Sequence, residues 1–112
     1  MKKKEIKFIV ELDENNLPRK IEWEASDADF AGRRECTSMM IRLWDKEEKN
    51  TMNIDLWTPE MLVQHMTIHY FHNLLSMAET LQRATGNLVL SEAIRQFAHE
   101  FAQQAGLKQG GD

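Results

Sequence analysis

The chain has 112 residues, of which 42% are hydrophobic and 29% are charged, and this balance is typical of a folded domain rather than a disordered segment. Fourteen basic and eighteen acidic side chains give a formal net charge of −4, so we expect no broad basic surface and no nucleic-acid partner. A single cysteine, Cys36, excludes an internal disulfide and favours a reducing compartment. We therefore expect one domain over residues 1–106 and a flexible tail over residues 107–112.

The sequence contains none of the patterns that mark a membrane span or the common enzyme classes. No apolar run approaches the roughly 20 residues that are needed to cross a bilayer, and charged residues interrupt the apolar segment behind the basic start. Gly-rich phosphate loops, CxxC pairs, HExxH and GxSxG are absent. We expect a cytoplasmic protein without membrane insertion, enzymatic activity or a cofactor.

The first half of the chain alternates apolar and polar residues, and this period of two predicts β-strands. Strands are expected over residues 5–12, 19–25, 37–45 and 51–57. They are joined by a hairpin turn at residues 13–16, a crossing loop at 26–35 and a charged turn at 46–50. In the last strand, we expect Met52, Ile54 and Leu56 to point into the core.

After residue 57 the apolar pattern changes to a period of 3.6 residues, which predicts a long helix. Thr58, Pro59 and Glu60 combine an N-cap, a proline at the first helical position and an acid in the first turn. We expect this helix to run from Pro59 to about residue 84 and to stop before Gly86. One broad stripe of the helix should cover the sheet: Val63, Met66, Tyr70, Leu74, Met77, Ala78 and Leu81.

A second amphipathic helix is expected to start at the N-cap Ser91 and to end near Gly106. Four strands followed by two helices predict an α+β domain. Its expected architecture is a four-stranded antiparallel sheet with one face covered by the two C-terminal helices.

Three histidines, His65, His69 and His72, share one face of the first predicted helix. They span about 10 Å of helix axis, which is long for a single ion with bonds near 2 Å, so we expect no metal site. Apolar side chains lie beside them: Met61, Leu62, Ile68 and Leu75. We expect this mixed face to serve self-association into a homo-oligomer, which protonation of the histidines below about pH 6.5 should weaken. Packing beneath the second helix or simple exposure are the alternatives.

The outward face of the predicted sheet is less polar than a solvent-exposed face should be. Ile9, Met40, Trp44 and Trp57 lie there among charged residues. We expect these four residues to bind an apolar segment of a protein partner, since methionine-rich surfaces adapt to varied shapes. Pairing of protomers through this face remains open, as does coverage by the alkyl stems of the charged neighbours.

Two further groups are expected to have no catalytic role. Glu22 and Glu24 point to the same side of a strand but lack apolar surroundings that would raise a carboxyl pKa. Cys36 has no histidine next to it in the sequence, so we expect an unreactive thiol.

The chain resembles the GldC family of gliding-motility-associated proteins. The matching stretches are Glu5–Phe8, Glu11–Pro18, Ile21–Trp23, Trp44–Asp45, Lys49–Thr51, Ile54–Thr58 and Arg83–Thr85. The resemblance does not extend to the three histidines. It implies a small, soluble accessory protein that works beside a lipoprotein and other components of the motility and secretion machinery, with no known catalytic residues.

The order of four strands and two helices is also similar to that of SecB-type export chaperones. Such chaperones hold unfolded clients on apolar sheet and helix surfaces, so a holdase is the alternative function. Because a fold does not determine a function, this similarity supports the alternative only in part.

Overall fold

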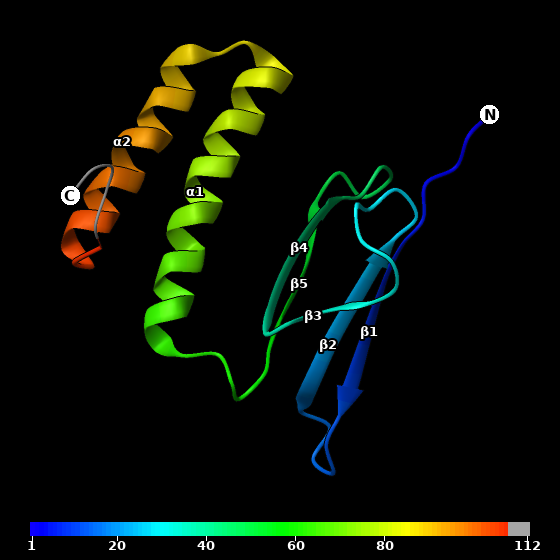
Figure 1. Ribbon diagram of the computed structural model, residues 1–112. Coiled ribbons are helices and arrows are strands. Elements are labelled where there is room, and N and C mark those ends of the chain that lie inside the picture. The colour runs from blue at the N-terminus through cyan, green and yellow to red at the C-terminus, as the bar shows by residue number, and fades with distance from the viewer. Residues whose placement is uncertain (108–112) are drawn as a thin grey trace. The chain divides into compact units, whose positions relative to one another are not determined.

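The structure is a computed structural model that describes residues 1–107, so the predicted tail lies outside the described residues except for Leu107. The chain divides into two compact units, Met1–Leu62 and Val63–Asp112. The first unit holds five strands: β1 (Ile6–Leu12), β2 (Pro18–Ala25), β3 (Arg34–Cys36), β4 (Ser38–Trp44) and β5 (Thr51–Trp57). The second unit holds two helices, α1 (Val63–Thr85) and α2 (Leu88–Gln104) (Figure 1).

These elements confirm the α+β class, but the expected four-stranded sheet is wrong. The strands form a three-stranded antiparallel sheet in the order β1-β2-β3 and a separate two-stranded ribbon, β4-β5. Within the first unit, β2 contacts β5. That the helices cover a sheet face, and that residues 1–106 form one domain, stay predictions.

The strands divide between two sheets because the chain changes its pairing partner at Thr37, where the third predicted strand begins. Cys36 pairs with Ile21 of β2, whereas Ser38 pairs with Trp57 of β5. Thr37 forms a bend between the two short ladders, in the manner of strands that cross from one sheet to another at a corner. β3 therefore begins inside the segment predicted as a crossing loop, at Arg34 and Glu35, and ends one residue beyond it at Cys36.

Short carboxylates shape both hairpin turns. In the β1–β2 turn, Asp13 Oδ1 accepts hydrogen bonds from the N–H groups of Asn15 (2.8 Å) and Leu17 (3.0 Å). In the β4–β5 turn, Asp45 Oδ2 accepts hydrogen bonds from two successive backbone N–H groups at 2.7 and 3.1 Å. Each turn also contains one residue with left-handed backbone, Asn16 (φ 61°) or Lys49 (φ 53°). The predicted hairpin turns are therefore confirmed.

The predicted start of the first helix is wrong by four residues. The Thr58 N–H donates to the Thr37 carbonyl at 2.9 Å and so extends the β4–β5 ladder. The Thr58 carbonyl then accepts from the Met61 N–H at 3.0 Å, which closes a turn, and α1 begins only at Val63. The threonine, proline and acid that are typical of a helix start thus form the exit of a strand.

The helices of the second unit run side by side as a hairpin (Figure 1). Gly86, with φ 71°, ends α1 as predicted, and its N–H donates to the Gln82 carbonyl at 2.8 Å. The N-cap of α2 is Asn87 and not Ser91, because Asn87 Oδ1 accepts the Leu90 N–H at 3.0 Å. Ser91 lies inside the helix and is buried.

The small core of each unit consists of few side chains. In the first unit, Ile21 is fully buried, and Trp23 contacts Phe30 edge to face with ring centroids 5.1 Å apart. In the second unit, three alanines are fully buried: Ala78 of α1 with Ala98 and Ala102 of α2. Alanine has no side chain beyond Cβ, so these positions allow close approach of the helix backbones.

Candidate functional site

The register of the β4–β5 ribbon places three of the four predicted partner-binding residues on one face. Met40 and Trp44 alternate with inward neighbours along β4, and Trp57 lies opposite Ser38, which shares their side of the strand. We call this side the tryptophan face; it carries Met40, Arg42, Trp44, Asp55 and Trp57 together with the polar residues Ser38, Thr51 and Asn53. The two tryptophans lie near opposite ends of the ribbon, about 20 Å apart at 3.3 Å per residue.

The tryptophan face combines exposed aromatic surface with a central ion pair. Residues Trp44 and Trp57 are 69% and 58% exposed, and Met40 is half-buried. Between them, Arg42 Nη1 donates to Asp55 Oδ1 at 2.6 Å. Both charges are partly open to water, so this pair contributes little stability, but it gives the strip a neutral polar centre between two apolar ends.

Ile9, the fourth predicted residue, belongs to a different surface. It lies on β1 opposite Glu22, on the charged face of the three-stranded sheet. Because the sheet divides at Thr37, the expected single outward face that joins Ile9 to Met40, Trp44 and Trp57 does not exist. The expectation that the four residues share one sheet is therefore wrong, and their role in partner binding stays a prediction.

The opposite side of the ribbon is aliphatic along its whole length. This aliphatic face consists of Met39, Ile41, Leu43, Met52, Ile54 and Leu56. Met39 is buried and Leu56 half-buried. Met52 and Ile54 were expected in the core, but they are 55% and 46% exposed, and Leu43 is 55% exposed. A two-stranded ribbon has too little surface to bury both of its faces.

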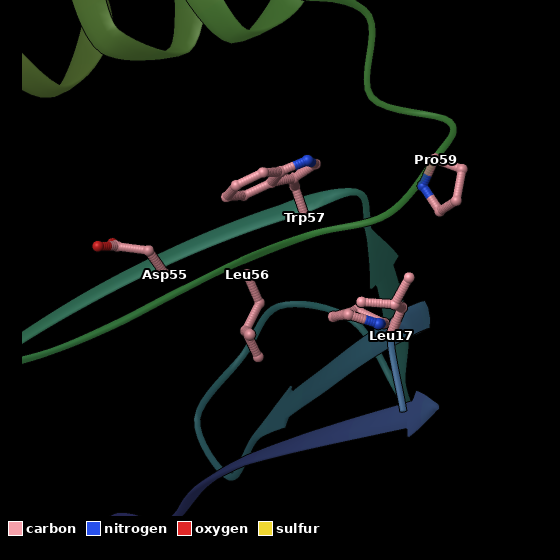
Figure 2. Close-up of a pocket in the computed structure, with 6 residues that line it drawn as sticks. Leu17, Asp55, Leu56, Trp57 and Pro59 are labelled. Carbon is pink, nitrogen blue, oxygen red and sulfur yellow. The ribbon is translucent and has the colours of Figure 1, made fainter. Parts of the chain in front are cut away.

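A hollow of about 310 Å³ lies where the end of β5 meets the β1–β2 hairpin (Figure 2). It is lined by Leu17, Pro18, Asp55, Leu56, Trp57 and Pro59. In Figure 2, Leu56 and Trp57 leave β5 on opposite sides, and Leu17 lies below Trp57, on the same side of β5 as Leu56. The sequence predicts a helix start at Pro59 and gives no binding role to Leu17 or Pro18. Contact between β2 and β5 is a tertiary feature, so no local pattern could have revealed this hollow.

The predicted self-association face is smaller than expected. Met61 and Leu62 precede α1 and belong to the first unit, where the Thr37 hydroxyl lies 3.2 Å from the Met61 sulfur as its hydrogen-bond donor. They therefore do not share a helix face with the histidines. The remaining residues, His65, Ile68, His69 and His72, lie on α1 as predicted.

The three histidines differ in their surroundings. His65 and His72 are exposed. His69 is half-buried, its Nδ1 lies 3.4 Å from the Asn73 amide nitrogen, and its Nε2 is buried without a hydrogen-bond partner among the described residues. In the chain up to residue 107, no group of three or more histidine, cysteine or acidic side chains is arranged to hold a metal ion.

The single thiol is poorly suited to nucleophilic chemistry. Burial raises the pKa of Cys36 above its ordinary value, and the nearby Glu35 carboxylate raises it further, against a lowering hydrogen bond from the Ser38 backbone. The thiolate is therefore scarce near neutral pH. This agrees with the expected unreactive thiol.

Neither α1 nor α2, the helices of the described chain, combines the length and apolarity needed to cross a membrane. Comparison with models of protein families gives a match over residues 18–107 to the family described as gliding motility-associated protein GldC-like. Comparisons with curated proteins and with solved structures give no significant match. The family match covers β2 to β5 and both helices, and it confirms the resemblance seen in the sequence. The chain belongs to the GldC-like family of gliding motility-associated proteins.

Proposed function

We propose that this chain is a non-enzymatic accessory protein of bacterial gliding motility and the associated secretion machinery, and that it acts as an adaptor through protein–protein contact. Membership in the GldC-like family supports the link to motility. The observation that carries the adaptor role is the exposure of Trp44 and Trp57 on one face of the β4–β5 ribbon. Exposed tryptophans are costly on a free surface and are enriched among the residues that dominate protein interfaces.

The chemistry of the tryptophan face indicates what the partner presents. Trp57 borders the apolar hollow beside the hairpin, and Trp44 offers a second apolar contact about 20 Å away. A partner segment that places an apolar side chain in the hollow and a second one on Trp44 would cover both ends. Its polar backbone or side chains would lie over the Arg42–Asp55 pair. A lipoprotein or another protein component of the gliding machinery is the proposed partner.

Quantitative partner capture from the native gliding bacterium tests this surface. Each tryptophan is replaced in turn, Trp44→Ala and Trp57→Ala, and Met40→Ala is added as a smaller truncation. We expect each tryptophan variant to weaken partner binding by at least about tenfold, because a central interface residue contributes about 2 kcal/mol or more. The partner should be recovered with the unchanged chain at one defined ratio.

Leu43→Ala is the matched control, since Leu43 lies on the same ribbon and is similarly exposed but belongs to the aliphatic face. It should leave partner capture unchanged. If the tryptophan variants and Met40→Ala also leave capture unchanged while the proteins remain folded, the tryptophan face is not the binding surface.

A SecB-like holdase is the second proposed function, and the aliphatic face is the observation that favours it. On the aliphatic face, which was expected to point into the core, Leu43, Met52 and Ile54 are about half exposed. The ribbon therefore has exposed apolar surface on both sides. A holdase would suppress aggregation of unrelated unfolded proteins, and Leu43→Asp with Met52→Asp would abolish the suppression. An adaptor would show no such suppression and would bind one folded partner.

A further inference from the structure

The edge strand β1 has one unpaired side. The three-stranded sheet has the order β1-β2-β3, so β2 covers one side of β1, and within residues 1–107 no strand pairs with its other side. Figure 1 shows β1, in dark blue, at the margin of this sheet. The strand has seven residues and contains neither proline nor glycine. Proteins usually protect such an edge with proline, bulges or repeated charges, because it can pair with another chain.

Two hydrogen bonds at the ends of β1 establish which backbone groups face the open edge. The Ser26 N–H donates to the Glu5 carbonyl at 3.0 Å, and the Asp13 N–H donates to the Leu17 carbonyl at 2.9 Å. Residues 5 and 13 therefore point their backbone groups toward β2, as do the alternate residues between them. The backbone N–H and C=O groups of the other set face the open edge: Ile6, Phe8, Val10 and Leu12.

The edge is regular as well as open. The register changes between Glu11, which pairs with Lys20, and Leu12, which pairs with Pro18. The extra residue, Arg19, is thus on β2, and β1 itself continues without a bulge. An uninterrupted strand can accept a full antiparallel partner.

We infer that two copies of this chain pair through β1, antiparallel, with a two-fold axis at Ile9. In that register Lys7 of each copy lies opposite Glu11 of the other, and the two Ile9 side chains lie opposite each other. These are non-hydrogen-bonded pairs, because their own backbone groups point to β2, and in such pairs the side chains lie closest. Within Ile6–Leu12 the strand is therefore complementary in charge to a second copy of itself, while Glu5 and Asp13, just beyond its two ends, lie opposite each other.

The other registers that keep the outward backbone groups paired lose this complementarity. A shift by two residues in one direction places Glu11 opposite Glu5 of the second copy. A shift by two residues in the other direction places Glu11 opposite Ile9, and Lys7 opposite Asp13, which lies beyond the end of β1 and whose carboxylate is already bound in the β1–β2 turn. Within β1 (Ile6–Leu12), whose charged residues are Lys7 and Glu11, only the register centred on Ile9 places these opposite charges against each other.

The apolar face of β1 gives the pairing its second source of affinity. Ile6, Phe8 and Leu12 are 52%, 46% and 53% exposed, although they share the face that carries Val10 and the buried Ile21. In the proposed register, Ile6 of one copy lies opposite Leu12 of the other, and Phe8 lies opposite Val10. Two three-stranded sheets would become one six-stranded sheet with a continuous apolar row. This pairing uses a surface other than the tryptophan face, and so it goes beyond the adaptor role.

Charge reversal tests the register directly by sedimentation of the full chain. The unchanged chain should sediment with twice the monomer mass of 13.1 kDa. Lys7→Glu gives two Glu–Glu pairs across the interface, and Glu11→Lys gives two Lys–Lys pairs. Each should raise the dimer dissociation constant by about tenfold or more. An equimolar mixture of the two variants restores opposite charges at both pairs, so it should form a dimer with nearly the original affinity.

The controls separate the interface from folding. Lys46→Glu makes the same charge change in the exposed β4–β5 turn and should leave the dimer intact. Lys7 and Glu11 also lie opposite Glu24 and Lys20 within the chain, so circular dichroism must show that both variants fold. Recovery in the mixture would occur although these internal repulsions persist.

Val10→Pro provides a second test that does not depend on charge. The Val10 N–H faces the open edge, where proline removes no bond to β2, so this variant should fold and remain monomeric.

A monomeric unchanged chain would overturn the proposal. So would dimers that tolerate all three β1 variants, since self-association would then use another surface such as His65 and His72 on α1. Partner capture through Trp44 is measured separately, and its failure leaves this result intact.

Discussion

Single side chains of this protein decide local conformation through short hydrogen bonds. Asp13 and Asp45 each accept hydrogen bonds from two backbone N–H groups in a hairpin turn. At the start of α2, Asn87 accepts a hydrogen bond from one backbone N–H group. The sequence predicted the two turns correctly because aspartate and asparagine are typical of them. The sequence pattern predicted Ser91 as the N-cap of this helix, because serine and asparagine are equally suitable at that position. Only the three-dimensional path of the chain shows that Asn87 is the N-cap.

The thiol of Cys36 should react slowly with alkylating reagents, because its surroundings raise its pKa. Burial and the Glu35 carboxylate raise the pKa of this thiol, so less thiolate is present at a given pH than in a free cysteine peptide. At about pH 8, alkylation by iodoacetamide should be slower for the folded chain than for the peptide, and urea should remove the difference. Glu35→Gln should speed the reaction of the folded chain.

The same pKa shift predicts how stability depends on pH. A thiol whose pKa is higher in the folded state than in the unfolded state holds its proton more tightly when folded. Its contribution to stability is complete below the unfolded pKa, near 9.0, and is lost as the pH rises through the folded pKa.

In the alkylation experiment, a folded chain that reacts as fast as the peptide would contradict the burial assigned to Cys36.

At the scale of elements, alternation and period predicted much of the chain. The hairpin of β1 and β2, the strands β4 and β5, and the two helices lie close to their expected positions. The helix start failed because Thr58 uses its N–H in the β4–β5 ladder. The prediction of a single sheet was wrong because the chain bends at Thr37, where β3 pairs with β2 and β4 pairs with β5. This choice of pairing partners is a long-range feature that no local pattern reveals.

The candidate surface was predictable to the same extent. Alternation within one strand placed Met40 and Trp44 together, and this is confirmed by the register. The position of Trp57 required the register between two strands, and that of Ile9 required the division into two sheets. Patterns within a strand are local, whereas registers and sheet boundaries follow from long-range packing.

The hairpin of α1 and α2 depends on small buried residues. Ala78, Ala98 and Ala102 are fully buried, so a larger side chain there must push neighbouring atoms aside. Ala98→Leu should lower the free energy of unfolding by about 1–3 kcal/mol, as overpacking commonly does. Urea denaturation measures the change.

Ala93→Leu is the matched control, because Ala93 lies on the same helix and is exposed. It should change the free energy of unfolding by no more than about 0.5 kcal/mol. An Ala98→Leu variant as stable as the Ala93→Leu variant would show that the interior of the hairpin has room to spare.

For the whole molecule, pairing through β1 would couple stability to concentration. A chain that folds and dimerises is stabilised by mass action, so its melting temperature rises with protein concentration. We expect this rise for the unchanged chain over about a hundredfold range of concentration. Lys7→Glu, whose dimer is weakened, should show a smaller rise over the same range.

Calorimetry at several concentrations makes this measurement, and Lys46→Glu serves again as the charge-matched control. If the unchanged chain melts at the same temperature throughout the range, the folded state gains nothing from a second copy. The dimer would also carry two tryptophan faces, so that a partner with two binding segments would dissociate more slowly than a partner with one.

The narrowness of the β4–β5 ribbon has a consequence for its motion. Two strands alone are marginally stable in water. Beyond its own ladder, this ribbon is held together by the backbone hydrogen bond from Thr58 to Thr37 and by the ion pair between Arg42 and Asp55. Backbone amides of this ribbon should therefore exchange their hydrogens with solvent through local opening, sooner than those of the β1–β2 hairpin. A bound partner would close that route, and the slowed exchange would map its footprint residue by residue along both strands.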